Sequence, residues 1–544
     1  MANPTTAATT TTTAKELTAD VLIVGGGTGG VAAALAAASL GKRVILAEET
    51  DWVGGQLTSQ AVPPDENTVL RENKPGGTAR YRAFREGVRD YYRRNHPLTD
   101  AAKADPKLNP GGGSVSPVCH EFPIGVAVLE AMLAPHRTTG RVRLMTKYKP
   151  VAAQVDGDRV RSVTLHSLLD HHDITITAPY VLDATELGDV LKLTKTEYVT
   201  GAESQKQTGE PHAADTPMPD NVQGFTWCFP IAFDPREGAD YTIDKPQQYE
   251  RWRDYTPHLT PAWPGKMFSW TYSQPRTLEP ITRMLFLRDG AKGGGTSFFK
   301  YRQIIQTGIY RDGHKPHEAT LVNWPQNDYW EHNVIDKPPE DVEVYLEEAR
   351  QMSLSLMYWL QTEAPRHDDK GAGYRGLYLR PDLVGTQDGL AQAPYFRESR
   401  RIKAVFTVTE NHIGKDARKG QTAAEPFADS VGIGHYNIDL HPSTGGRNYI
   451  DVPSFQFQIP LGALLPVRME NLLPACKNLG VTHITNGCYR LHPVEWNIGE
   501  SAGMLAAFCL DRNVPPRAVR EKKELLDEFQ KLLRDQGVVL SWQT

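Results

Sequence analysis

The sequence predicts an α/β protein in which a domain built on a parallel sheet is interrupted by a second domain of mixed α+β type. Three observations lead to this prediction. A short apolar strand, a glycine-rich turn, a small-residue helix and a second apolar strand follow one another within residues 21–48. Further apolar, strand-like segments occur at residues 141–190 and 471–510. A long stretch rich in aromatic residues and proline lies between these two segments.

This pattern sets the domain boundaries that we expect. At about 150 residues per domain, 544 residues leave room for three or four domains. The strand-like segments reduce this number to two, because separated parts of the chain must meet in one sheet. We predict a first domain from residues 20–190 plus 461–544 and a second from residues 191–460. Residues 1–19 contain a Thr/Ala run that cannot bury surface, which predicts a disordered tail.

Composition excludes several classes of function. The 60 Lys and Arg residues against 65 Asp and Glu give a net charge of −5, too little positive charge for sequence-independent nucleic-acid binding. The apolar run from Val21 to Leu40 is broken by GGGTGG, so we predict no membrane span. The five cysteines form no C-x-x-C pair. We therefore expect no metal site and no disulfide framework, and we expect a cytoplasmic location.

The first motif predicts a Rossmann-like dinucleotide-binding unit. Val21–Val24 is a buried strand, and the glycines that follow it have the spacing G-x-G-x-x-G. Gly25 permits the tight turn, Gly27 lets a pyrophosphate approach the backbone, and Gly30 lets the helix pack against the strand. Glu48 ends the second strand, where it can accept hydrogen bonds from ribose hydroxyls. The alternative is a glycine-rich turn such as any α/β protein can contain. Here, however, the strand, the helix, the second strand and the acidic residue follow one another in the order that dinucleotide binding requires.

Three later segments resemble one known family. Asp51–Thr58, which contains Gly54-Gly55, resembles the second glycine motif of FAD-dependent oxidoreductases with a glutathione-reductase type of FAD domain. Tyr180–Leu182 followed by Asp183-Ala184-Thr185 resembles the strand-plus-ATG signature of the same enzymes, with Glu186 in place of the common glycine. Residues 471–510 resemble their last FAD segment, in which a helix points its N-terminus at the flavin. An ordinary Gly-Gly turn and a buried small-residue helix are the alternatives for the first and last segments.

The resemblance implies FAD as the cofactor and a set of residues that hold it. In that last segment, His492-Pro493 opens the predicted helix, whose dipole would stabilise negative charge on the reduced flavin. The expected cofactor-binding residues are Gly25, Gly27, Thr28, Gly29, Gly30, Glu48, Glu49, Gly54, Gly55, Gln56, Ala184, Thr185, Asn478, Asn497 and Ile498.

The middle of the chain is the expected substrate side. Seven of the ten tryptophans fall between residues 227 and 359. Their flat faces suit a sugar ring, a cyclitol or an aromatic substrate, although large aromatics also fill any core. The segment Ala393–Arg401 resembles an arginine-rich motif of the same family, so that Arg397 would fix a substrate oxygen or the flavin. The alternative is a solvated charge cluster paired with Glu398.

An enzyme that oxidises an alcohol or amine by hydride transfer needs a base near flavin N5, and histidine is the usual choice. The candidates are His412, His435, His441 and His492. His492 is the first choice because it opens the helix expected against the flavin. His441 is the second, because Tyr436 and Asp439 nearby can orient it.

Missing motifs narrow the reaction. A second G-x-G-x-x-G unit and a C-x-x-C pair are both absent from the sequence, which argues against a built-in NAD(P)H domain and a redox disulfide. We expect electrons to enter from a small organic substrate and to leave to oxygen, a quinone or a separate carrier. One alternative is a carbon–carbon dehydrogenase or reductase that uses Arg397 or Arg400. Another is a flavin-binding sensor or assembly protein without turnover.

The C-terminal residues 517–536 carry an apolar stripe at helical spacing. This stripe predicts a helix packed on the first domain, and it would equally serve as a contact in a homo-oligomer.

Overall fold

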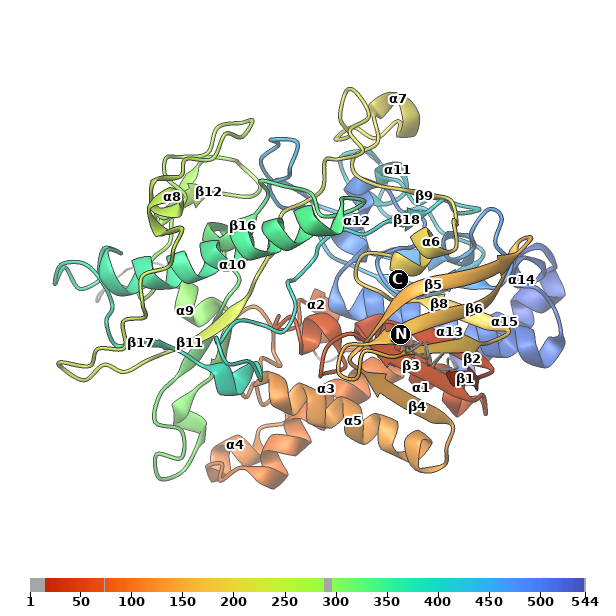
Figure 1. The fold of residues 1–544 in the computed structure, drawn as a ribbon, viewed down its shortest axis with the longest axis horizontal. Coiled ribbons are helices and arrows are strands. Elements are labelled where there is room, and N and C mark those ends of the chain that lie inside the picture. Colours follow the sequence, from red (N-terminus) through yellow and green to blue (C-terminus); the bar gives the residue numbers. More distant parts are fainter. Residues whose placement is uncertain (1–14, 73, 288–295, 543–544) are drawn as a thin grey trace, which may run out of the picture.

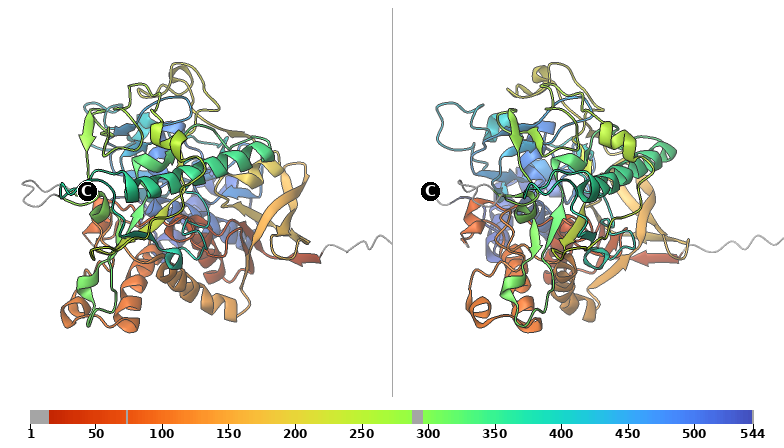
Figure 2. Two further views of the ribbon diagram at one scale, coloured as in Figure 1. Left: turned by 60° about the vertical axis from the view of Figure 1, so that its left-hand side comes forward. Right: turned by 90° about the vertical axis from the view of Figure 1, so that its left-hand side faces the viewer.

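The computed structural model describes residues 15–72, 74–287 and 296–542. Its elements gather into two regions, with the N- and C-terminal segments on one side and elements from residues 225–380 on the other (Figure 1). Two further views bring the second region toward the viewer, in front of the first (Figure 2). Among the described residues, no helix combines the length and the apolar character needed to cross a membrane.

A five-stranded parallel sheet organises the first region, as the sequence predicts. The strand order is β23-β8-β2-β3-β4, so segments hundreds of residues apart pair side by side. Every residue of the central strand β2 is buried, because helices cover one face and a second sheet covers the other. The strands are β2 (Val21–Val24), β3 (Val44–Glu48), β4 (Val142–Thr146), β8 (Tyr180–Asp183) and β23 (Leu472–Pro474).

Two helices pack on this sheet, and they cross so closely that their backbones are in contact. These are α1 (Thr28–Ser39) and α13 (His492–Arg512), where the sequence places them. A Cβ on Gly499 would lie 2.0 Å from the carbonyl oxygen of Gly29, so only glycine fits at this crossing. The crossing fixes the N-termini of both helices relative to the sheet. Helices α3 (Ala79–Asn95) and α5 (Phe122–Thr138) extend the helical layer.

The second sheet is a meander with one added parallel strand. Its order is β1-β7-β6-β5, and the turn between β5 and β6 falls at Gly157. Of the predicted disordered tail, residues 1–14 lie outside the described residues, whereas Lys15–Thr18 form β1 against β7. The remaining strands are β5 (Tyr148–Asp156), β6 (Arg159–Ser167) and β7 (Asp173–Thr177).

An aromatic core holds the second region together. A four-stranded antiparallel sheet, β14-β15-β11-β17, packs against the long helix α10 (Pro339–Thr362). All seven tryptophans of the middle segment are buried in this core, which favours a packing role for most of them. The strands are β11 (Phe229–Phe233), β14 (Gln303–Ile305), β15 (Ala319–Val322) and β17 (Leu377–Leu379).

Residues beyond position 400 return to the first region. Val431 and Phe457, which fall within the predicted second domain, lie in the same core as α1 and α13. The C-terminal stretch forms two helices instead of one, and Phe529 and Leu533 join that core. The elements of this part used below are β16 (Asp328–Tyr329), β20 (Ile438–Leu440), β21 (Ile450–Val452), α12 (His483–Tyr489), α14 (Pro516–Glu521) and α15 (Lys523–Asp535).

Candidate functional site

The two glycine motifs, at residues 25–30 and 54–55, contact each other and form one surface of backbone without side chains. The hydroxyl of Thr28 donates to the carbonyl of Gly54 at 2.8 Å, and the Gly54 amide donates to the carbonyl of Gly26 at 2.7 Å. A Cβ on Gly55 would lie 2.9 Å from the Cα of Gly27, so Gly55 does not tolerate a side chain. This surface lies at the N-terminus of α1, whose first N–H groups have no acceptors within the helix. An anion with many oxygens fits such a surface.

A cavity of about 470 Å³ opens beside these glycines, and we call it the glycine cavity. Seven of the predicted cofactor-binding residues line it: Gly25, Gly27, Glu48, Glu49, Gly55, Ala184 and Thr185. They come from the ends of β2, β3 and β8 and from the second glycine motif. The carboxyl ends of parallel strands therefore place them together, as expected for a nucleotide site.

Glu48 is held rigidly at the rim of the glycine cavity. One carboxylate oxygen accepts a hydrogen bond from the Gly26 amide at 2.7 Å, and the other accepts from the amide and hydroxyl of Thr50. Burial raises the pKa of Glu48 to about 7, although these hydrogen bonds lower it. A fixed acceptor at the end of the second strand is what a ribose hydroxyl requires.

Glu186, the residue that departs from the family signature, lies over the glycine surface. Its Oε1 is 3.0 Å from the position that a Cβ on Gly27 would take, and its other oxygen pairs with the ammonium of Lys477. Lys477 is buried, and its Nζ is 4.0 Å from an oxygen of Glu495 on the first turn of α13. Burial raises the pKa of Glu495 to about 7, and the charge on Lys477 opposes that shift. A lysine and two carboxyl groups thus surround the expected phosphate position.

The other predicted cofactor residues lie outside the lining of the glycine cavity. Thr28, Gly29, Gly30, Gly54 and Gln56 shape the surrounding turns and helix contacts. Asn478 donates to the carbonyl of Asp183 at 3.0 Å, Asn497 accepts from the Ile433 amide at 3.2 Å, and Ile498 is in the core. Asn478 and Asn497 thus make hydrogen bonds within the protein and Ile498 packs in the core, and none of the three is in the lining of the glycine cavity.

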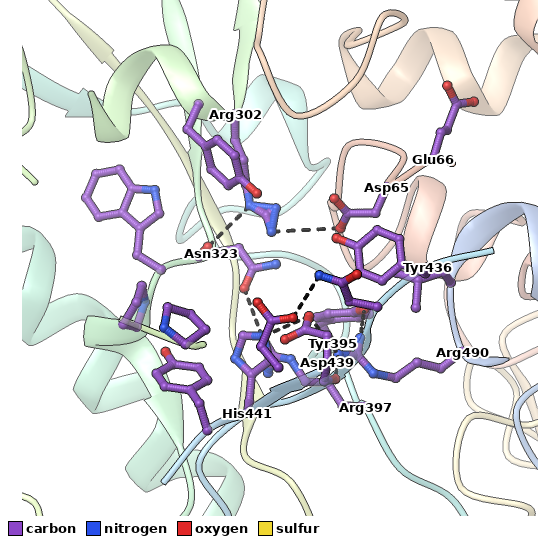
Figure 3. A pocket seen from close by; sticks show the side chains of 18 of the residues that line it. Asp65, Glu66, Arg302, Asn323, Tyr395, Arg397, Tyr436, Asp439, His441 and Arg490 are labelled. Atoms are coloured by element: carbon purple, nitrogen blue, oxygen red, sulfur yellow. Dashed lines mark hydrogen bonds and ion pairs between the residues drawn. The ribbon is translucent and has the colours of Figure 1, made fainter. Parts of the chain in front are cut away.

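A second cavity, of about 410 Å³, lies at the boundary of the two regions. We call it the arginine cavity, because Arg71, Arg283, Arg302, Arg397 and Arg490 line it (Figure 3). Its other polar walls carry Asp65, Asp439, Asp451 and His441. Aromatic side chains complete the lining: Tyr272, Phe298, Tyr301, Trp324, Tyr395, Tyr436 and Tyr449. Aromatic walls with a few fixed charges are typical of a site for a small polar molecule.

One extended segment borders both cavities. Tyr395 and Arg397 face the arginine cavity, whereas Pro394 and Phe396 face the glycine cavity. Successive side chains of extended backbone point to opposite sides, which explains this division. Residues 393–397 therefore form part of the lining of each cavity. The arginine-rich motif predicted from the sequence includes this segment.

His441 and Arg397 share one buried carboxylate. Nδ1 of His441 is 2.5 Å from Oδ2 of Asp328, and the guanidinium of Arg397 is 3.0 Å from Oδ1 of the same group. Arg397 also donates to the carbonyl of Gly224 at 2.7 Å and to the side-chain oxygen of Asn323 at 3.2 Å. The carboxylate of Asp328 is fully buried, so both partners are fixed in orientation.

This arrangement leaves His441 as a neutral base. Burial and the charge on Arg397 lower the pKa of His441, and Asp328 opposes that shift. A buried carboxylate acts as the acceptor for Nδ1–H, so the lone pair is on Nε2. Nε2 lies 3.8 Å from an oxygen of Asp439, which also lines the cavity. His441 can therefore accept a proton from a molecule bound in the arginine cavity.

The structure places His492, the first choice from the sequence, elsewhere. His492 is fully buried, lines neither cavity, and accepts a hydrogen bond at Nδ1 from the Asp65 amide at 3.1 Å. Burial lowers its pKa to about 4. Helix α13 does begin at His492, but its imidazole points into packed protein and fixes the loop that carries Asp65.

The other candidates divide between the cavity and the packed interior. His435 lines the arginine cavity, whereas His412 packs against Phe406 and Phe427. Arg400 pairs with Asp189 and Asp336 and lines neither cavity. The alternative of a solvated charge cluster is wrong, because Arg397, Glu398, Arg400 and Arg401 are all buried. Glu398 pairs with Arg401 and His483.

Several residues of the arginine cavity carry no signal in the sequence. Asn323, Asp65 and Arg302 line the cavity from segments without a motif. Asp328, which holds His441 from behind the lining, belongs to the two-residue strand β16. Arg490 is different, because it lies two residues before the predicted helix at His492. Its guanidinium donates to the Tyr395 hydroxyl at 2.7 Å, which ties the C-terminal segment to residues 393–397.

The residues around the glycine cavity fit the phosphates and the ribose of an FAD molecule. A side chain at Gly25 or Gly55 would clash with backbone, the helix N-terminus supplies donors, and Glu48 supplies the acceptor for the ribose. The donor set and the bare backbone both match a dinucleotide.

A comparison with known protein families also indicates FAD as the cofactor. A family model described as FAD dependent oxidoreductase matches residues 20–533. No curated protein matches the sequence. Solved structures that match include L-proline dehydrogenase from P. horikoshii, at 15% identity over 36% of this chain and 26% of that chain, with a TM-score of 0.19. This chain therefore spans about a quarter of that protein's length.

Two other structures match over more of the chain. A geranylgeranyl bacteriochlorophyll reductase-like protein from Thermoplasma acidophilum is 12% identical over 96% of this chain and 85% of that chain, with a TM-score of 0.29. The anhydrotetracycline hydroxylase OxyS from Streptomyces rimosus is 12% identical over 95% of this chain and 66% of that chain, also with a TM-score of 0.29. TM-scores this low carry no argument about activity.

Proposed function

The chain belongs to the FAD-dependent oxidoreductase family, and from this premise we propose that it oxidises a small polar alcohol bound in the arginine cavity. The observation that carries the proposal is the His441–Asp328 pair on the wall of that cavity. FAD, when bound, supplies the acceptor for a hydride and its electron pair. The chain itself has to bind the alcohol, orient its C–H bond and take up the hydroxyl proton.

His441 fits the role of the proton acceptor. Its Nε2 carries the lone pair, because Nδ1–H is engaged by Asp328. As the C–H bond of the alcohol breaks, the hydroxyl proton moves to Nε2 and the C–O bond becomes a carbonyl. The imidazolium that forms is stabilised by the negative charge of Asp328. The proton must leave to water before the next turnover, and Asp439, 3.8 Å from Nε2, lies on the cavity side.

The walls of the cavity support a ring-shaped polar substrate such as a sugar or a cyclitol. Trp324, Tyr395 and Tyr449 supply flat faces, and carboxylates and guanidinium groups alternate between them. Such a mixture binds the faces of a sugar ring by stacking and its hydroxyls by charged hydrogen bonds. Electrons would then leave the cofactor to oxygen, a quinone or a separate carrier.

A second candidate reaction is dehydrogenation or reduction of a carbon–carbon bond. The observation that favours it is Arg397, a buried guanidinium on the cavity wall that could hold a carboxylate next to the reacting bond. In the proposed alcohol oxidation, Arg397 instead fixes Asp328.

Anaerobic titration of the FAD-loaded protein separates the two reactions. Bleaching of the flavin absorbance by alcohols, abolished in a His441→Gln protein that retains FAD, is the expected result. Reoxidation of chemically reduced protein by activated alkenes, with no bleaching by any alcohol, would favour the second reaction. A His441→Gln protein that bleaches as fast as the parent would contradict the role of this histidine.

A further inference from the structure

Three buried hydrogen-bond donors of the arginine cavity have no acceptor. They are Nη1 of Arg302, Nδ2 of Asn323 and Nε1 of Trp324, and none has a partner within the described part of the chain. Asn323 is 6% exposed and Trp324 is 2% exposed, so bulk water does not satisfy them. Buried donors without acceptors are costly and rare in native proteins, and they call for an explanation. All three side chains line the cavity.

These donors belong to one rigid wall. Arg302 immediately precedes β14, and Asn323 and Trp324 immediately follow the neighbouring strand β15. The Leu321 amide donates to the carbonyl of Arg302 at 3.0 Å, and Nε of Arg302 donates to the carbonyl of Asn323 at 3.3 Å. The sheet therefore holds the three donors in fixed positions. We call residues 302, 323 and 324 the donor wall.

Donors outnumber acceptors around the whole cavity. Nε of Arg397 and Nε of Arg490 are also buried without a partner among the described residues, which makes five such donors, whereas two carboxylate oxygens of the lining, Oδ1 of Asp65 and Oε2 of Glu66, lack a partner. Asp65 is also the nearest countercharge to Arg302, at 3.8 Å. A molecule that satisfies this lining must bring more acceptors than donors. A carboxylate does so, since it has two oxygens that accept and none that donates.

The donor wall is joined to the proposed base by a continuous network. Asn323 accepts from Arg397, Arg397 contacts Asp328, and Asp328 accepts from His441. Figure 3 shows Arg302 and Asn323 on one side of the cavity and Asp439 and His441 on the other. A molecule that spans the cavity can therefore place an acid group on the donor wall and a hydroxyl at His441.

We propose that the substrate is a polyhydroxylated carboxylic acid of the sugar-acid type, with its carboxylate on the donor wall and its reacting hydroxyl at His441. This proposal rests on the proposed alcohol oxidation and adds the acid group. A carboxylate suits the wall better than a phosphate, because Asp65 already neutralises part of the charge on Arg302 and so leaves less positive charge for a doubly charged group. A cavity of about 410 Å³ has room for an acid of sugar size.

Matched ligands test this inference on the FAD-loaded protein. The three ligands are D-gluconate, D-glucitol and a sugar phosphate, which are similar in size and differ mainly in the acid group. Binding of each is measured by the change in the flavin absorbance spectrum. The acid is expected to bind at least tenfold more tightly than the polyol and the phosphate. Equal binding of acid and polyol, or preference for the phosphate, would overturn the assignment of a carboxylate.

Two variants test whether the preference for the acid comes from the donor wall. Asn323→Asp keeps the shape of the side chain and the acceptor for Arg397, but replaces the free donor by a negative oxygen. Arg302→Gln removes the charge of the wall. Both are expected to lose at least tenfold in affinity for the acid with little change for the polyol. Arg253→Met, at a half-buried position outside both cavities, is the control. Equal losses for acid and polyol would contradict the inference.

The same titrations separate this inference from the proposed oxidation. If the acid binds on the donor wall but never bleaches the flavin, the proposed oxidation fails and the acid site stands. If neutral polyols bleach the flavin as well as the acid does, the oxidation stands and the acid site fails.

Discussion

Nδ1 of His441 and Oδ2 of Asp328 lie 2.5 Å apart, although 113 residues separate them in the chain. Asp328 also contacts Arg397, and no part of its carboxylate reaches solvent. The pair therefore fixes both the orientation and the tautomer of the imidazole. Each property can be tested separately.

The first prediction concerns the tautomer of His441. Asp328→Asn keeps the shape of the side chain, but its amide can donate to Nδ1 and so move the proton to Nε2. The rate of flavin reduction by the substrate is expected to fall by a factor of about 10² to 10⁴, the range for loss of a general base. Stopped-flow absorbance of the FAD-loaded variant measures this rate. A variant with unchanged FAD content and an unchanged rate would contradict the role of Asp328.

The second prediction concerns pH. Burial and Arg397 lower the pKa of His441, so the imidazole stays neutral from alkaline pH down to below its ordinary value of about 6.5. A base must be neutral to accept a proton, and the rate of reduction should therefore be flat above about pH 6.5 and decline only at lower pH. Reduction rates between pH 5 and 9 provide the measurement. An acid limb centred above pH 7 would be inconsistent with this assignment.

The third prediction distinguishes the two histidines. His441→Gln should abolish substrate-dependent bleaching while FAD remains bound. His492→Gln should lower the thermal midpoint, because a buried acceptor for the Asp65 amide is disturbed, but should retain the pH profile of the parent. Reduction rates and thermal unfolding of both variants are compared side by side. Loss of the pH-dependent limb in His492→Gln alone would return the role of base to His492.

The fourth prediction concerns the helix crossing. A Cβ on Gly499 would lie 2.0 Å from the Gly29 carbonyl, so Gly499→Ala must push α13 away from α1. Overpacking of this kind costs about 1–3 kcal/mol of the free energy of unfolding. Thermal unfolding should show a lower midpoint and weaker retention of FAD. Gly308→Ala is the matched control, since no heavy atom would lie within 4 Å of its new Cβ.

The fifth prediction concerns cofactor affinity. Burial raises the pKa of Glu495 to about 7, and its carboxylate shares Lys477 with Glu186 beside the expected phosphate position. A bound pyrophosphate disfavours the charged carboxylate, so binding takes up a proton and FAD affinity should fall as pH rises from 6 to 8. A one-unit rise of the pKa on binding corresponds to about tenfold in affinity.

Titration of the apoprotein with FAD, followed by fluorescence, tests this dependence. Glu495→Gln keeps an acceptor for its neighbours but cannot titrate, so its affinity should vary less with pH. Identical pH dependence in the parent and in Glu495→Gln would show that another group is responsible.

The sequence predicts the cofactor side of the protein because that chemistry is local. Gly25, Gly27 and Gly30 lie within six residues. A strand directly precedes them, and the helix, the second strand and Glu48 that complete the dinucleotide-binding motif follow. The Tyr180–Asp183 strand and the helix at His492 are recognisable for the same reason, since each carries its own short pattern. Glu186 is visible in the sequence as a departure, but its pairing with Lys477 is not.

The substrate side could not be predicted to the same extent. His441 was a candidate by residue type, yet the partner expected from the sequence was Asp439, two residues away, and the buried partner is Asp328. Arg302 and Asn323 carry no motif, and they become neighbours only because β14 and β15 pair. His492 has the better motif, but its imidazole points into packed protein.

The sequence by itself determined that this chain builds a Rossmann-like FAD domain, because glycine spacing and apolar periodicity act over a few residues and leave their mark in the chain. Tertiary structure alone decided which charged side chains face a common cavity, because burial, orientation and pairing of charges depend on contacts between strands and loops that are separated in the chain, as Asp328 and His441 are by 113 residues. The base, its carboxylate and the donor wall are properties of that packing.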